Sequence, residues 1–128
     1  AKGARSAEGV AKAASLNEGK AVSRRAVTEF VDGVTVVDVR SGNVLTGTVD
    51  LRPTLKRIES QVLYTFRNDG AIFNNFDGII PLKPVGYYHE YVHPTPGIPG
   101  AGPQRLITGQ GGELFYTPDH YRTFIPLN

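Results

Sequence analysis

The sequence predicts a small α+β domain, in which one short helix precedes an antiparallel β-sheet and packs on it. A single amphipathic pattern with the helical period lies over residues 53–62. After it, short apolar runs punctuated by Gly and Pro continue to the end of the chain, as in a meander of short strands. The sequence has neither an internal repeat nor a heptad pattern, so this order of elements is that of an α+β fold.

Composition separates the start of the chain from the rest. Residues 1–43 contain one of the 12 aromatic residues, Phe30, and none of the nine Pro or three His. A segment so poor in large apolar side chains cannot bury much core. We therefore expect a linker or helical segment at residues 1–43 and a single core domain at residues 44–128.

Two patterns follow each other within the N-terminal segment. Residues 1–19 are rich in Ala and Gly, and are interpreted as either weakly helical or partly disordered. Apolar residues at spacings of four, from Val22 to Phe30, then form one helical stripe over residues 20–31. VTVVDVR, residues 34–40, is β-branched and partly alternating, which predicts a first strand there.

The core domain begins with a strand and the helix. VLTGTVDL, residues 44–51, follows a Ser-Gly-Asn turn and is typical of a strand. Pro53 is favoured in the first turn of a helix, and apolar residues at i, i+3 and i+7 follow from Leu55 to Val62. Later strands are expected at residues 71–73, 79–80, 87–92, 105–108, 114–117 and 121–127. Residues 94–103 are too rich in Pro and Gly for a central strand and are expected to form a long loop.

Composition also excludes several classes of protein. Without Cys, the chain has no disulfide, thiolate metal site or cysteine nucleophile. No apolar run approaches the roughly 20 residues of a membrane helix, and the first ten residues lack the apolar stretch of a signal peptide. The net charge of +2 lies wholly in residues 1–43, and it is too small to predict a nucleic-acid binder by itself. Because the chain starts at Ala1 and contains no Met, we expect it to be part of a longer polypeptide.

One strand carries an unusual carboxylate. In GYYHEYV, alternation places Tyr88, Glu90 and Val92 on one face of the expected strand. The commoner case is a Glu on the solvated face of a sheet. The alternative is a partly desolvated carboxylate whose pKa suits a general base. The pattern alone leaves both alternatives open.

Two further polar residues extend this set. Arg105 opens the RLIT strand, either as an exposed strand-end side chain or as a fixed guanidinium that binds phosphate or pairs with Glu90. His120 lies in a turn, either as a solvated group or as a general acid near neutral pH. Together, the three side chains can move a proton off one oxygen and onto another across a phosphate.

Metal and nucleotide-cofactor sites are less favoured. His89 and His93 are four residues apart on an expected strand, so they point to one face but lie two pleats apart. The sequence contains neither a phosphate-binding Gly loop followed by Lys-Ser/Thr nor a dinucleotide fingerprint. We expect no cofactor and no metal.

At these residues the sequence resembles the microbial guanyl-specific ribonucleases, the family of barnase. The matching blocks occur in family order: TGTVDL (46–51), NDGAIFNN (68–75), GYYHEY (86–91), RLITG (105–109) and YTPDHYRTF (116–124). The resemblance covers residues 44–128 and implies the microbial ribonuclease fold. It also implies a metal-independent endoribonuclease that cleaves single-stranded RNA by transesterification to a 2′,3′-cyclic phosphate.

The resemblance assigns a role to each matching position. Glu90 corresponds to the general base, Arg105 to the phosphate-binding arginine and His120 to the general acid. Tyr121 corresponds to a tyrosine near the phosphate. The guanine-recognition loop corresponds to Phe73, Asn74, Asn75, Phe76 and Asp77.

The chain departs from the family pattern at three places. The loop that usually ends Asn-Arg-Glu here ends Asn75-Phe76-Asp77, which leaves the guanine preference open. A second arginine often found before the RLITG block is absent, with Ala101 near that place, so phosphate binding is expected to depend more on Arg105, with Arg122 and His93 as candidate substitutes for the missing arginine. Asp50 stands where some extracellular relatives have a cysteine.

A second resemblance concerns the biological setting. The N-terminal segment and the stretches HPTPG (93–97), GPQR (102–105) and YTPDHYRTFIPLN (116–128) resemble the C-terminal nuclease domains of bacterial polymorphic toxins, such as contact-dependent growth inhibition proteins. This implies a secreted or cell-surface effector delivered to the cytoplasm of a target bacterium. It also implies a cognate immunity protein, which we expect to be acidic, and an otherwise monomeric chain. The alternatives are a free secreted ribonuclease and a non-catalytic RNA- or protein-binding domain.

Overall fold

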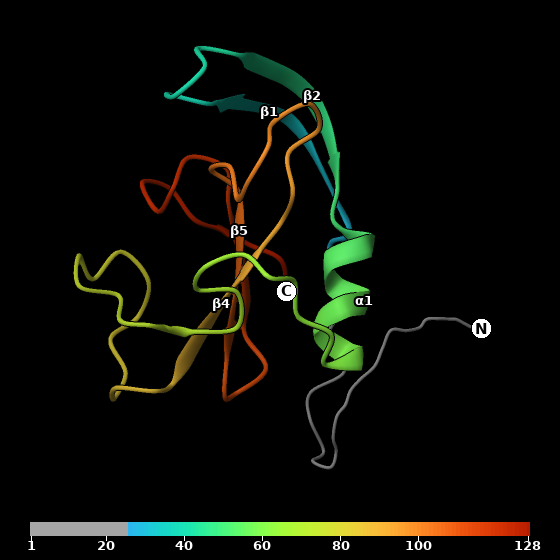
Figure 1. The fold of residues 1–128 in the computed structure, drawn as a ribbon. Coiled ribbons are helices and arrows are strands. Elements are labelled where there is room, and N and C mark those ends of the chain that lie inside the picture. The colour runs from blue at the N-terminus through green and yellow to red at the C-terminus, as the bar shows by residue number, and fades with distance from the viewer. Residues whose placement is uncertain (1–25) are drawn as a thin grey trace.

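The computed structural model describes residues 26–128 (Figure 1). The expectation for residues 1–19, and most of the helical stripe at 20–31, lies outside the described residues. Residues 26–29 have no regular secondary structure, and the next residues belong to a strand. The expected helical stripe is therefore wrong at its C-terminal end.

The described residues form one helix and two antiparallel sheets, which confirms the α+β class. The elements are β1 (Phe30–Val37), β2 (Val44–Asp50), α1 (Arg52–Ser60), β3 (Ile72–Phe73), β4 (Tyr88–Val92), β5 (Arg105–Gly109), β6 (Leu114–Thr117) and β7 (Ile125–Pro126). Strands β1 and β2 form a separate hairpin, and β3 to β7 form a five-stranded sheet in sequence order. In Figure 1, α1 runs alongside the larger sheet and the hairpin projects beyond it. No helix within residues 26–128 has the length and apolarity needed to cross a membrane.

The hairpin belongs to the core of this domain. The register between β1 and β2 shifts by one residue between Val31 and Val34, and Gly33 at this bulge has φ +66°. The extra residue turns Val31, Val34 and Val36 toward the same interior, where all three are buried. The expected boundary between residues 43 and 44 thus falls in the turn between two paired strands.

The helix forms where the sequence predicted it but is shorter. Pro53 lies in its first turn, as expected. At its end Gln61 is left-handed, with φ 59°, and the N–H groups of Gln61 and Val62 donate to Ile58 O and Arg57 O. This cap stops the helix, so Val62, expected on its apolar face, lies beyond it and is half exposed.

Alternation along β5 divides the apolar residues into two clusters. Leu106 faces a cluster shared with the hairpin and the helix, and Ile107 faces the opposite side of the sheet. The first cluster contains Val31, Val34, Val36, Leu51, Leu106, Tyr116 and Leu127. The second contains Ile80, Tyr88 and Ile107, with Phe73, Tyr87, Phe115, Tyr121 and Phe124 packed against it. Ile79 and Ile80, expected as a strand, are not in one, although Ile80 is buried in the second cluster.

A buried ion pair joins the helix to the central sheet. Arg57 of α1 lies 2.9 Å from Asp69, and the exposed fractions of the two side chains are 7% and 0%. Asp69 also accepts hydrogen bonds from the N–H groups of Val92 (2.8 Å) and Tyr64 (2.6 Å). Next to it, Gly70 N donates to Glu90 O at 2.7 Å. These bonds hold the middle and end of β4 in place.

Candidate active site

Glu90 and Arg105 meet on one face of the large sheet. In the β4–β5 register, Arg105 is opposite Val92 and Glu90 is opposite Ile107, so the two side chains are diagonal neighbours. Both residues are buried, and Arg105 Nε lies 3.9 Å from Glu90 Oε1. The solvated-face alternative for Glu90 and the exposed strand-end alternative for Arg105 are therefore wrong.

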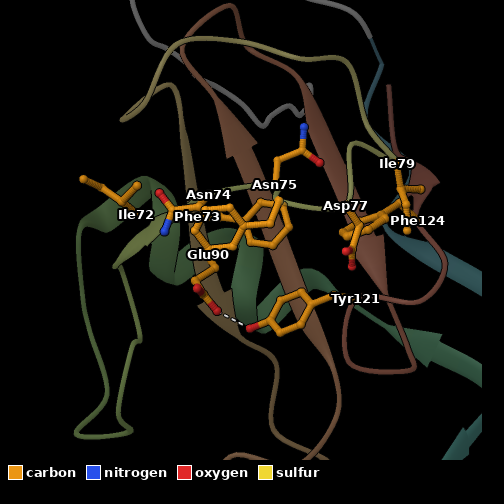
Figure 2. A pocket seen from close by; sticks show the side chains of 10 residues that line it. Ile72, Phe73, Asn74, Asn75, Asp77, Ile79, Glu90, Tyr121 and Phe124 are labelled. Atoms are coloured by element: carbon orange, nitrogen blue, oxygen red, sulfur yellow. Dashed lines mark hydrogen bonds between the residues drawn. The ribbon is translucent and has the colours of Figure 1, made fainter.

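The surroundings of Glu90 make its carboxylate more basic. Burial raises the pKa of Glu90, and the hydrogen bond from the Tyr121 hydroxyl and the charge of Arg105 offset part of that rise. Tyr121 donates this bond to Glu90 Oε1, as the dashed line in Figure 2 marks. Burial first, and then this bond, raises the pKa of the Tyr121 phenol, so the hydroxyl stays protonated and keeps donating.

Backbone carbonyls of residues 101, 102 and 104 accept hydrogen bonds from the Arg105 guanidinium. Its NH1 group donates to Gly102 O at 2.7 Å and to Gln104 O at 2.8 Å, with a longer contact to Ala101 O at 3.5 Å. Its Nε is buried beside Glu90 and has no hydrogen-bond partner among the described residues.

His120 lies in a strained turn that several bonds hold together. His120 and Tyr121 have φ of 58° and 76°, a conformation that side chains with a Cβ rarely adopt. Asp119 Oδ1 accepts from Thr123 N at 2.8 Å and Arg122 N at 3.1 Å, and its Oδ2 accepts from Thr123 Oγ1 at 2.7 Å. Such strain is typical of functional sites.

The charge state of His120 depends on its neighbours. Partial burial, followed by the charges of Arg105 and Arg122, holds the pKa of the His120 imidazole below its usual value of 6.5. Its ring packs against Tyr121, with 4.7 Å between centroids. The His120 pKa is thus lowered while that of Glu90 is raised.

A cavity of about 260 Å³ adjoins the Glu90–Tyr121 pair. It is lined by the whole of the segment that sequence analysis proposed for base recognition: Phe73, Asn74, Asn75, Phe76 and Asp77. Ile72, Ile79, Glu90, Tyr121 and Phe124 complete the lining (Figure 2). The Phe73 ring stacks on Tyr121, with 5.3 Å between centroids and 22° between planes.

The proposed base-contacting residues differ in how their side chains are placed. Asn75 is buried, and its amide donates to Ile80 O at 2.9 Å, pointing away from Glu90 in Figure 2. Asn75 therefore shapes the loop with its side chain. Phe76, by contrast, is 91% exposed, and Asn74 and Asp77 are also exposed. These three are free to contact a ligand that enters the cavity.

The two suggested helpers of Arg105 lie in different places. Arg122 is exposed next to His120 and is close enough to lower its pKa. His93 is buried between the sheet and the helix, where its Nδ1 is hydrogen-bonded to Thr54 Oγ1 at 2.7 Å. With its ring turned to the helix, His93 is not placed to assist Arg105.

Sequence reasoning missed some residues of the site. It did not find the Tyr121–Glu90 hydrogen bond or Asp119, which supports the His120 turn. An Asp preceding a His in a turn is a weak signal for such support, because Asp often accepts hydrogen bonds from the backbone that follows it. The Tyr121–Glu90 contact joins residues 31 apart, which no local pattern encodes.

Comparisons with known proteins identify the family of this chain. A ribonuclease family model matches residues 47–128. Guanyl-specific ribonuclease St from Saccharopolyspora erythraea is 45% identical over 71 residues, which cover 56% of this chain and 70% of that protein. Guanyl-specific ribonucleases Sa and Sa3 from Kitasatospora aureofaciens are 43% and 44% identical over 72 residues, covering 75% and 51% of their lengths.

Solved structures of one relative share the fold. Ribonuclease Sa2 in its complexes with mononucleotides is 39% identical, with a TM-score of 0.58 over 60% of this chain and 80% of that one. Ribonuclease Sa2 with guanosine-2′-cyclophosphate gives a TM-score of 0.56 at 39% identity. Because the family model spans more than half of the sequence, this chain belongs to the ribonuclease family and is an endoribonuclease.

Proposed function

We propose that the enzyme cleaves single-stranded RNA by metal-independent acid–base transesterification, leaving a 2′,3′-cyclic phosphate. One observation carries the proposal: the cavity beside Phe73 opens onto Glu90, whose carboxylate is buried next to Arg105. A base in the cavity brings the attached ribose to a carboxylate that can take its 2′ proton. In this reaction, the role of Arg105 is to stabilise the charge that develops on the phosphate.

The proposed reaction uses each group once. Glu90 removes the proton from the 2′-hydroxyl, and the 2′-oxygen forms a bond to phosphorus. The bond from phosphorus to the 5′-oxygen breaks, and His120 gives its proton to that oxygen. Arg105 stabilises the charge on the non-bridging oxygens, and Tyr121 keeps Glu90 oriented through its hydrogen bond.

The two shifted pKa values define the active pH range. Activity needs Glu90 deprotonated, so it rises with pH through a pKa above the ordinary 4.5. It needs His120 protonated, so it falls through a pKa below 6.5. The expected kcat/KM profile is a narrow bell between these limits.

The decisive experiment is cleavage of total RNA in EDTA, with the new ends and their sequences mapped. The proposal expects cleavage and cyclic phosphate ends, and both are lost in Glu90→Gln and His120→Ala. Wild-type activity in both variants would reject the assigned roles. A folded wild-type protein that cleaves no RNA would instead support the non-catalytic binding domain.

For base recognition, we propose stacking on Phe73 and Phe76, with Asp77 accepting hydrogen bonds from the base edge. Asp77 is one methylene shorter than the Glu usual in the family, and Phe76 replaces an arginine. These changes favour a weaker preference for guanine than in the guanyl-specific relatives. The preference for guanine is measured as the ratio of kcat/KM values for dinucleotides that differ only in the 5′ base. A preference for guanine undiminished in Asp77→Ala would contradict this role.

For biological role, we propose the C-terminal nuclease domain of a secreted or cell-surface bacterial effector. The sequence stretches at 93–97, 102–105 and 116–128 support it. An acidic immunity protein would cover the site that contains Arg105 and His120 and associate rapidly by charge complementarity. Expression in bacteria with and without the product of the neighbouring gene tests this. Growth arrest relieved by that product supports the toxin, whereas unaffected growth favours a free secreted ribonuclease.

A further inference from the structure

The segment between β4 and β5 lacks regular structure although it borders the site. Residues 93–104 include four Pro, which cannot donate backbone hydrogen bonds. At the base of the segment, His93 N donates to Gln104 O at 3.2 Å. This bond ties the two ends of the segment together, and the remaining contacts of its C-terminal end come mainly from side chains.

That end holds two proposed catalytic residues at once. The carbonyls of Gly102 and Gln104 accept from Arg105 NH1 at 2.7 and 2.8 Å. The carbonyl between them, Pro103 O, accepts from His120 N at 2.9 Å. Three consecutive carbonyls thus set the relative position of the guanidinium and the strained histidine turn.

A buried set of side chains anchors this end of the segment. Gln104 Nε2 donates to Thr95 Oγ1 at 2.9 Å, and Tyr116 OH donates to Gln104 Oε1. Thr95, Gln104 and Tyr116, here called the Gln104 network, are 3%, 2% and 0% exposed. The network also touches Gly102, where an added Cβ would lie 2.9 Å from Thr95 Oγ1.

We infer that the Gln104 network is a positioning device that aligns Arg105 with His120. Burying three polar side chains is tolerated only when they satisfy one another, and such a network holds one geometry because its alternatives leave polar groups unpaired. The network acts through the carbonyls at 102–104 and does not touch substrate. The inference rests on the proposed function for its effect on rate.

Thr95 offers a matched pair of variants. Thr95→Val keeps the shape and removes the hydroxyl, whereas Thr95→Ser keeps the hydroxyl. We expect Thr95→Val to lower kcat on a dinucleotide roughly ten- to a hundredfold with little change in KM, because misalignment affects the transition state more than binding. Thr95→Ser should restore the wild-type rate.

A second readout does not require cleavage. The pKa of His120, measured by NMR titration of its ring proton, should rise toward 6.5 in Thr95→Val, since Arg105 no longer holds its place beside the imidazole. Arg122, Asp119 and Tyr121 also border His120 and are unchanged in both variants. Val36→Ala, in the hairpin, is the control for lost stability, and it should change neither kcat nor this pKa.

The outcomes separate the inference from the proposed function. If Thr95→Val lowers stability like Val36→Ala but leaves kcat and the His120 pKa unchanged, the network is only structural and the inference is wrong. Equal losses in Thr95→Ser and Thr95→Val also overturn it. If Thr95→Val does not fold, Tyr116→Phe tests the same network by removing one hydroxyl. If the wild type cleaves no RNA, the proposed function fails, but the NMR titration still decides the inference.

Discussion

Two buried arginine–carboxylate pairs contact strand β4 but are built differently. Arg57 and Asp69 are 2.9 Å apart, and Asp69 accepts further bonds from two backbone N–H groups. Arg105 and Glu90 are 3.9 Å apart, and the carboxylate receives its hydrogen bond from Tyr121. In the first pair, here called the closed pair, protein donors occupy both carboxylate oxygens, which suits a structural tie. In the second pair, here called the site pair, the Glu90 carboxylate also lines the cavity, which suits contact with a substrate.

The largest expected effect is the loss of kcat when Glu90 of the Glu90–Arg105 pair is replaced. Glu90→Gln removes the general base and should lower kcat by about 10²–10⁴-fold, the usual contribution of a positioned base. Stability should not fall, because burial raises the pKa of Glu90 in spite of Tyr121 and Arg105, so the folded state disfavours its charge. Rates on a dinucleotide and urea unfolding curves measure both. Retained activity would mean that Glu90 is not the base.

Removing the charge of Asp69 in the Arg57–Asp69 pair should instead lower stability. Asp69→Asn leaves Arg57 buried without its counter-charge, so the free energy of unfolding should fall by about 3–5 kcal/mol. Asp50→Asn is the control, because the Asp50–Arg52 pair is exposed and should contribute under about 1 kcal/mol. Urea denaturation at pH 7 compares them. Equal losses of unfolding free energy in the two variants would show that burial of the Arg57–Asp69 pair does not increase its contribution to stability.

The buried His93 should make the stability of the protein depend on pH. Near the closed pair, burial lowers the pKa of His93 to about 4, Asp50 opposes the shift, and Arg57 adds to it. Because His93 then binds a proton more weakly in the folded than in the unfolded state, stability is full above about pH 6.5 and falls as pH drops toward 4. The expected loss is about 3 kcal/mol.

Replacing His93 isolates its contribution to the pH dependence of stability. His93→Gln removes the titrating ring, so its unfolding free energy should depend less on pH than that of the wild type between pH 6.5 and 4. Denaturant curves at several pH values measure the difference. Parallel curves for the two proteins across this range would contradict the buried neutral His93.

The smallest expected effect is at the rim of the cavity beside the site pair. Phe76→Ala should raise KM for RNA, because stacking of a base on an aromatic ring contributes about 1–3 kcal/mol, and should leave kcat and stability unchanged since Phe76 is 91% exposed. Leu82→Ala, also exposed but outside the cavity lining, is the control and should change nothing. Equal KM values for the two variants would contradict stacking of a base on Phe76.

Local patterns predicted the strands of the site well. RLIT and LFYT appear as β5 and β6 with bounds within one residue of those expected, because each is a short β-branched or aromatic run between turn residues. The face shared by Tyr88, Glu90 and Val92 was also predicted from alternation alone, and all three are buried. Alternation could not say whether that face was covered, since coverage depends on other segments.

Where prediction failed, distant contacts were responsible. Phe30 was assigned to a helical stripe, but pairing with Asp50 places it in a strand. Ile79 and Ile80 form a short apolar run, yet only Ile80 is buried. In each case, the partner that decides the outcome lies far along the chain or belongs to a neighbouring element, so a local pattern has no access to it.

By itself, the sequence determined the fold class, the short helix after Pro53 and the order in which Glu90, Arg105 and His120 occur on successive elements. These depend on periodicity, turn residues and a family pattern, all of which are local or linear. Only the tertiary structure decided that Glu90 is buried beside Arg105, that Tyr121 donates to it and that His93 turns to the helix. Burial and pairing set the pKa values, and both arise only when segments distant in the chain pack together.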